Sequence, residues 1–132
     1  MKYTISATSA PETPGHIDIK ETHISFGTAA NSSQLANPAE VFLSAFAACM
    51  LKNVARFSEM MPFQYYKATV EVTATREEKP PRIDQLTYAL TIQSKDTGLN
   101  PMLLKKNIEK FGTIYNTMAK SCRIEGNIQV IE

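Results

Sequence analysis

The sequence predicts an α+β fold in which helices pack on antiparallel β-sheet. Three observations lead to this prediction. Apolar and polar residues alternate in several short segments, one long central segment is almost entirely apolar, and the period of two returns near the end of the chain. With 132 residues the chain can bury one core, so we expect a single domain over residues 1–132.

The composition is that of an ordinary globular protein, with 43% hydrophobic residues, 20% charged residues and a net charge of +1. This balance offers no electrostatic footprint for nucleic acid or anionic lipid. The first residues, MKYTISATSA, lack the apolar segment of a secretory signal, so we expect a cytoplasmic protein. The longest apolar run, residues 41–51, is shorter than the roughly 20 residues that span a bilayer, and we expect no membrane helix.

The N-terminal segment predicts short strands, because apolar and polar residues alternate along it. A turn region at residues 11–15 ends the first strand, and residues 27–36 are mostly small and polar, which predicts a loop. The parity of the apolar positions changes once between the later strands. These positions are Tyr3, Ile5, Ala7, Ile17, Ile19, Ile24 and Phe26.

A long helix is predicted to begin at Asn37, an N-cap residue, and to run to about Met60. Pro38 suits the first helical position, and Glu40 can reach back to the backbone N–H of the cap. The middle of this segment, VFLSAFAACML, has no polar side chain larger than serine, and such a helix is buried on every face. Since one small sheet covers one side, we expect a second subunit to cover the other, in an obligate homodimer.

The second half predicts an antiparallel hairpin, from alternating segments at residues 66–75 and 86–92 on either side of the charged connection REEKPPR. Asn100 and Pro101 then start one amphipathic helix, which we expect to direct Lys105, Lys106, Glu109 and Lys110 toward water. Its apolar positions are Leu104, Ile108, Phe111, Tyr115 and Met118. After Ser121 the period of two predicts a last strand, with Cys122 pointing inward.

The two cysteines, Cys49 and Cys122, are the candidates for chemistry. Their separation fits no metal-binding spacing, and His16 and His23 belong to no ligand motif, so we expect no metal site. The five scattered glycines form no GxGxxG or Walker loop, so we expect no nucleotide cofactor. A thiol in mid-helix gains nothing from the helix N-terminus, and apolar surroundings disfavour its thiolate, so local physics favours an inert Cys49. The residues on its helix face are Phe42, Ala45, Phe46, Asn53 and Arg56.

The run NPAEVFLSAFAAC, followed by a second cysteine at the head of a C-terminal strand, resembles the OsmC/Ohr family. That family comprises osmotically inducible protein C and the organic hydroperoxide resistance proteins. The resemblance extends in element order over nearly the whole chain, through KATVEVTATREE to SCRIEGNIQV. It implies an intertwined homodimer in which antiparallel sheets wrap around long central helices. It also implies reduction of organic hydroperoxides by a cysteine pair that an external dithiol resets.

The resemblance places Cys49 at the peroxidatic position and Cys122 at the resolving position. Attack of the Cys49 thiolate on the peroxide O–O bond would give a sulfenic acid, and Cys122 would condense with it to a disulfide. Phe42 and Phe46, on the face of Cys49, are the candidate substrate contacts.

Two activating groups of the family are missing from this chain. Ala39 stands at the carboxylate position, and the first arginine is Arg56, too late to be the arginine of the N-terminal half. The substitutes that the chain offers are Lys52, Arg56 and the histidines and lysines of the N-terminal strands.

Three functions therefore stand side by side. The first is a thiol peroxidase of organic hydroperoxides that uses Cys49 and Cys122. The second, favoured by the missing arginine and carboxylate, is a protein without turnover that binds a small hydrophobic or electrophilic ligand in a dimer cleft around Phe42, Phe46 and Cys49. The third is a structural homodimer with inert thiols.

Overall fold

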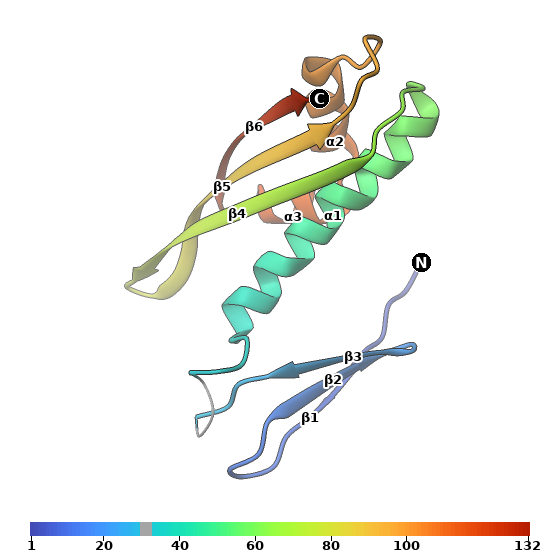
Figure 1. Ribbon diagram of the computed structural model, residues 1–132. Coiled ribbons are helices and arrows are strands. Elements are labelled where there is room, and N and C mark those ends of the chain that lie inside the picture. Colours follow the sequence, from blue (N-terminus) through green and yellow to red (C-terminus); the bar gives the residue numbers. More distant parts are fainter. Residues whose placement is uncertain (30–32) are drawn as a thin grey trace. The chain divides into compact units, whose positions relative to one another are not determined.

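The structure, a computed structural model, describes residues 1–29 and 33–132 and forms two compact units, Met1–Ser44 and Ala45–Glu132 (Figure 1). Part of the predicted loop at residues 27–36 lies outside the described residues. The expectation of a single domain over residues 1–132 stays a prediction.

The N-terminal unit contains a three-stranded antiparallel sheet in the order β1 (Ser6–Thr8), β2 (Gly15–Ile19) and β3 (Thr22–Phe26). A two-residue turn joins β2 to β3, and Lys20 in this turn has a φ of 55°. The turn explains why the parity of the apolar positions changes between the two strands. Gly15 pairs with Phe26, whose ring occupies the place where a larger residue would carry its Cβ.

Helix α1 (Pro38–Met60) begins with the predicted capping box. Asn37 Oδ1 accepts a hydrogen bond from the Glu40 N–H at 2.8 Å, and Glu40 Oε1 accepts one from the Asn37 N–H at 3.0 Å. Both predicted helix-start roles are therefore confirmed. The Glu40 carboxylate is used at the cap, about half a turn of the helix away from the direction of Cys49.

Within one chain α1 buries a stripe rather than its whole surface, comprising Phe46, Met50, Asn53, Val54 and Phe57. Phe42 and Met60 are 43% and 63% exposed. By length and composition alone this 23-residue helix is apolar enough to cross a bilayer, although its most apolar run, residues 41–51, is too short to do so. The central helix of a soluble protein passes the same test, so length and composition alone do not make α1 a membrane helix. Cover of α1 by a second subunit stays a prediction.

The C-terminal unit contains a sheet in the order β4 (Lys67–Glu78), β5 (Pro81–Gln93) and β6 (Arg123–Ile131). The antiparallel hairpin of β4 and β5 is confirmed, but its strands are longer than the alternation predicted. Most of the charged connection REEKPPR continues the ladder, and the turn is confined to Lys79 and Pro80. These charged residues are exposed, so the alternation that revealed the rest of the strands is absent there.

The α+β class is confirmed, but one pairing differs from the expected antiparallel arrangement. Strand β6 runs parallel to β5, in a register that opposes Gln85 to Arg123. Parallel neighbours need a crossover connection, which here consists of α2 (Pro101–Phe111) and α3 (Thr113–Met118). The helices pack on the face of β5 that carries the core (Figure 1), whose fully buried side chains are Phe46, Met50, Val54, Leu86, Leu90, Ile92, Leu104 and Ile108.

Candidate functional site

Cys49 lies on α1, in the C-terminal unit, as a free and half-buried thiol. Its sulfur accepts a hydrogen bond from the Asn53 side chain, with an Nδ2–Sγ distance of 3.5 Å. The same nitrogen donates to the Cys49 carbonyl oxygen at 2.9 Å. Asn53 is itself buried, with 8% of its surface exposed. The predicted shared face of Cys49 and Asn53 is therefore a direct contact.

Gly112, where the predicted second helix breaks, also lies near the sulfur. A Cβ built on Gly112 would lie 3.5 Å from Cys49 Sγ, 3.2 Å from Tyr115 Cβ and 2.9 Å from the Ile108 carbonyl oxygen. The single helix predicted through Met118 was wrong at this point. Gly112, with φ −74° and ψ 118°, ends α2 and starts α3, because extended backbone cannot continue the helical hydrogen bonding.

Phe46, one turn before Cys49, is completely buried. Its ring centroid lies 6.0 Å from that of Tyr88 and 6.0 Å from that of Tyr115. Phe42, in the N-terminal unit, is 43% exposed. Of the two predicted substrate contacts, Phe46 is thus part of the aromatic core beside the sulfur, and Phe42 presents open apolar surface.

A carboxylate joins this aromatic core from α2. The Tyr88 hydroxyl donates to Glu109 Oε2 at 2.6 Å, and Lys105 Nζ donates to the same oxygen at 2.8 Å. Burial, reinforced by the carboxylate of Glu109, raises the pKa of Tyr88 well above its usual range. Burial, followed by the negative charge of Glu109, also raises the pKa of Tyr115. The expectation that Lys105 and Glu109 simply face water was wrong, because both belong to this partly buried network.

Within residues 1–29 and 33–132, neither Lys52 nor Arg56, two of the predicted substitutes for the missing arginine, forms a hydrogen bond with the sulfur of Cys49. The Arg56 guanidinium lies over the rings of Phe57 and Phe111, with its Cζ 5.3 Å and 6.0 Å from their centroids. Lys52 is exposed. From the sequence we expected a cationic side chain beside the sulfur of Cys49, whereas in the structure its hydrogen-bond partner is the neutral amide of Asn53. The signal that could have found Asn53 is a polar residue four positions after the cysteine on an apolar face.

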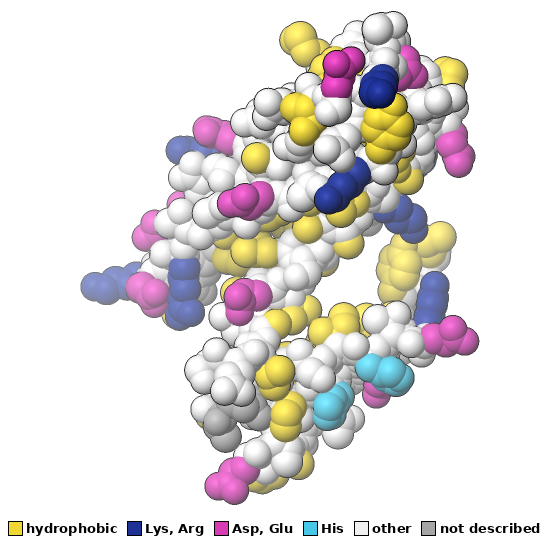
Figure 2. Space-filling model, in the orientation of Figure 1, with side chains coloured by type: hydrophobic (Ala, Val, Ile, Leu, Met, Phe, Trp, Pro, Cys, Tyr) yellow, Lys and Arg dark blue, Asp and Glu magenta, His cyan; other side chains and the backbone are white. Residues whose placement is uncertain are grey.

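The histidines, which are also predicted substitutes, belong to the sheet of the N-terminal unit, where they are shown in cyan in Figure 2. His16 lies on β2, and the imidazole of His23 on β3 is hydrogen-bonded to the carboxylate of Asp18 on β2. Their delivery to Cys49 across a dimer stays a prediction. No group of three or more histidine, cysteine, aspartate or glutamate side chains suited to a metal ion occurs within residues 1–29 and 33–132.

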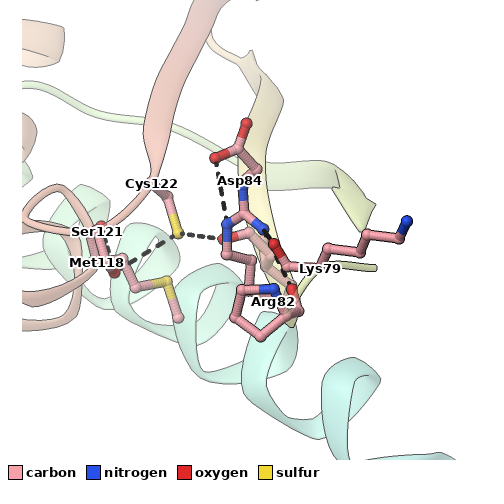
Figure 3. A network of polar contacts seen from close by, with 8 residues as sticks. Lys79, Arg82, Asp84, Met118, Ser121 and Cys122 are labelled. Atoms are coloured by element: carbon pink, nitrogen blue, oxygen red, sulfur yellow. Dashed lines mark hydrogen bonds and ion pairs between the residues drawn. The ribbon is translucent and has the colours of Figure 1, made fainter. Parts of the chain in front are cut away.

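Cys122 lies just before β6 and points inward, as the alternation predicted, with 9% of its surface exposed. Its thiol donates a hydrogen bond to the Ile83 carbonyl oxygen at 3.4 Å and lies 3.8 Å from Ser121 Oγ. Figure 3 shows this sulfur between the end of α3 and the start of β5, near Arg82 and Asp84. Both cysteines are free, and the partners of one sulfur do not include the other.

Comparison with known proteins identifies the family. A family profile described as "OsmC-like protein" matches residues 31–127, about three quarters of the chain. The comparison with curated proteins gives no match.

Several solved structures share the fold. An OsmC-like protein from Mycoplasma pneumoniae superposes with a TM-score of 0.88 at 16% identity, over 100% of this chain and 99% of that one. An organic hydroperoxide resistance protein OsmC from Legionella pneumophila gives a TM-score of 0.69 at 16% identity, over 96% and 97% of the two chains. The organic hydroperoxide resistance protein OhrB of Bacillus subtilis gives 0.65 at 13% identity, over 98% of each chain. The predicted resemblance is confirmed, and the chain belongs to the OsmC-like protein family.

Proposed function

We propose that this protein is a thiol peroxidase that reduces organic hydroperoxides through Cys49. The single observation that carries the proposal is the state of this residue, a free and half-buried thiol on the central helix beside a wholly buried phenylalanine. Partial exposure lets a small peroxide reach the sulfur, and apolar surroundings suit an alkyl or aryl substituent. Membership of the OsmC-like family, with solved relatives named as organic hydroperoxide resistance proteins, supports the same chemistry.

The proposed reduction of a hydroperoxide proceeds in three steps. The Cys49 thiolate attacks one peroxide oxygen, the O–O bond breaks, and the alkoxide leaves with a proton from solvent as the alcohol. The resulting sulfenic acid condenses with a second thiol, which forms an S–S bond and releases water. An external dithiol then reduces this disulfide by exchange and becomes oxidised itself.

Cys122 is the proposed resolving thiol, and Phe42 and Phe46 are the proposed contacts of the organic group. A disulfide needs Cα atoms about 4.4–6.8 Å apart. In the structure each sulfur has its own partners, so condensation within the chain requires the Cys122 thiol to leave the Ile83 carbonyl. An external thiol that attacks the sulfenic acid directly is the route that needs no such movement.

The proposal includes a cytoplasmic homodimer. Its basis is the apolar surface that one chain leaves open, including Phe42 and Met60 of α1. Light scattering after size-exclusion chromatography is expected to give twice the mass of one chain. A mass of 14.7 kDa would remove the dimer from the proposal.

The test measures consumption of cumene hydroperoxide with dihydrolipoamide as reductant. Cys49→Ser is expected to abolish consumption, since an alcohol is a far weaker nucleophile than a thiolate. Cys122→Ser is expected to slow turnover but to leave the first step intact, so dimedone should trap a sulfenic acid on Cys49 in that variant. Peroxide consumption equal in wild type and Cys49→Ser would overturn the proposal.

A second candidate is binding of a small hydrophobic or electrophilic ligand without turnover. The observation in its favour is the neutral partner of Cys49, because a thiolate is usually activated by a cation or a helix N-terminus. Absence of peroxide consumption, combined with saturable binding of a hydrophobic fluorescent probe that Phe42→Ala weakens, would select this function.

A further inference from the structure

Asn53 is the polar member of the buried stripe on α1, in the middle of an otherwise apolar set. Burial of an amide is costly unless it is hydrogen-bonded, and an apolar side chain of the same size would fill the position without that cost. The helix does not need this amide, because the Cys49 carbonyl oxygen already receives the backbone N–H four residues later. The helical geometry alone therefore leaves the choice of asparagine unexplained.

The hydrogen bonds of Asn53 fix the orientation of its amide. The Cys49 carbonyl oxygen only accepts, so the group 2.9 Å from it must be the amide nitrogen and not Oδ1. That nitrogen carries two hydrogens, and one of them is left for a second acceptor. The acceptor within reach is Cys49 Sγ, at 3.5 Å.

We propose that Asn53 is a catalytic residue that stabilises the Cys49 thiolate by donating an N–H to its sulfur, in place of a cation. A hydrogen bond to an anion is stronger than one to a neutral acceptor, so the amide stabilises the thiolate more than the thiol. The thiol proton leaves to solvent. As a step in peroxide reduction this inference rests on the proposed function, but the thiolate itself can be measured without any peroxide.

Removal of the donor while the shape is kept tests the proposal. In a Cys122→Ser background, with Cys49 as the one cysteine, the rate of alkylation by iodoacetamide is measured at pH 7 and at pH 9.5. Asn53→Leu is expected to slow alkylation about three- to tenfold at pH 7 and to leave the rate at pH 9.5 nearly unchanged, since solvent then removes the proton without help. Asn53→Asp, which faces the sulfur with a carboxylate, is expected to slow the reaction at pH 7 at least as much.

The chain offers a matched control in Asn107, whose amide donates to the sulfur of Met61 at 3.6 Å. Asn107→Leu makes the same chemical change beside a sulfur that never ionises, and Cys49 alkylation should not respond. Melting curves followed by circular dichroism establish that each variant folds.

Two outcomes would overturn the proposal. One is an Asn53→Leu variant that is alkylated at pH 7 as fast as its parent. The other is equal slowing at both pH values, which indicates altered access to the sulfur and not a lost donor. Absence of peroxide consumption in the wild type, together with the expected alkylation pattern, would refute the proposed function and leave the role of Asn53 at the thiolate standing.

Discussion

The surroundings of Cys49 and Cys122 differ in the direction of their hydrogen bonds. Both sulfurs lie in the C-terminal unit, yet Cys49 accepts an N–H from Asn53, whereas Cys122 donates its S–H to the Ile83 carbonyl. A hydrogen bond that the sulfur accepts stabilises its thiolate form. A sulfur that donates a hydrogen bond must keep its proton. Burial adds to the contrast, because Cys122 is buried and Cys49 half-buried. Two thiols of one chain are thus prepared for different chemical states.

The largest expected effect comes from the aromatic core beside Cys49. Phe46→Ala should lower the free energy of unfolding by about 3–5 kcal/mol, because it removes a buried ring and leaves a cavity. Urea denaturation followed by circular dichroism measures this change. Phe42→Ala, on the same helix but 43% exposed, is the control and should cost much less. Equal losses would mean that Phe46 does not anchor the surroundings of Cys49.

Gly112→Ala should sharpen the contrast between the two thiols. The new Cβ would lie 2.9 Å from the Ile108 carbonyl oxygen, so the backbone must shift, at an expected cost of about 1–3 kcal/mol. Because Gly112 adjoins Cys49, the alkylation rate of Cys49 should change while that of Cys122 stays constant. Peptide mapping by mass spectrometry separates the two rates. Gly98→Ala is the matched control, since a Cβ there would approach the flexible side chain of Asp96, at 3.1 Å, and not a backbone atom of the described residues.

The wild-type protein should itself show the contrast. At pH 7.5 iodoacetamide is expected to modify Cys49 at least about tenfold faster than Cys122. The thiolate is the nucleophile, and the buried thiol of Cys122 keeps its proton because it donates a hydrogen bond. Mass spectrometry of peptides taken over time gives both rates. Faster modification of Cys122 would reverse the assignment of the attacking thiol.

The smallest expected effect concerns pH and the Tyr88–Glu109 pair. The pKa of Tyr88 is raised in the folded protein, so its contribution to stability is complete below the ordinary tyrosine value near 10 and is lost as the pH rises further. Tyr88→Phe should cost about 1 kcal/mol at pH 8, since it removes the hydrogen bond to Glu109. The difference from wild type should shrink between pH 10 and 11 in urea titrations. A constant difference would mean that the pKa of Tyr88 is the same in the folded and the unfolded protein, and therefore that folding does not raise it.

Local signals account for the parts of the fold that the sequence predicted correctly. The capping box at Asn37 and Glu40, the alternation in β4 and β5, and the inward direction of Cys122 all depend on neighbours along the chain. The parallel pairing of β6 depends on how the crossover helices return to the sheet, which no local pattern specifies. The break at Gly112 was missed because the apolar spacing continues across it at Phe111, Tyr115 and Met118.

The sequence identified the two cysteines of the candidate site, but not the groups that form hydrogen bonds with their sulfur atoms. Family resemblance identified Cys49 and Cys122, and helical periodicity placed Asn53 and Arg56 on the face of Cys49. Periodicity cannot tell which of two polar residues turns toward the sulfur. Arg56 lies two turns after Cys49, and its guanidinium packs over aromatic rings. Asn53 has a short side chain that donates a hydrogen bond to the carbonyl oxygen of Cys49 in the preceding turn.

The parallel pairing of β5 and β6 has a kinetic consequence. A contact between strands so far apart along the chain forms only after the intervening helices have closed the loop, so this half of the sheet should assemble late. Until then β5 has one edge with unpaired backbone groups, onto which a strand of another chain can add. The strands β4 and β5 are adjacent along the chain, so their hairpin can form before β6 pairs with β5. During refolding the greatest risk of aggregation should therefore fall in the interval between these two events.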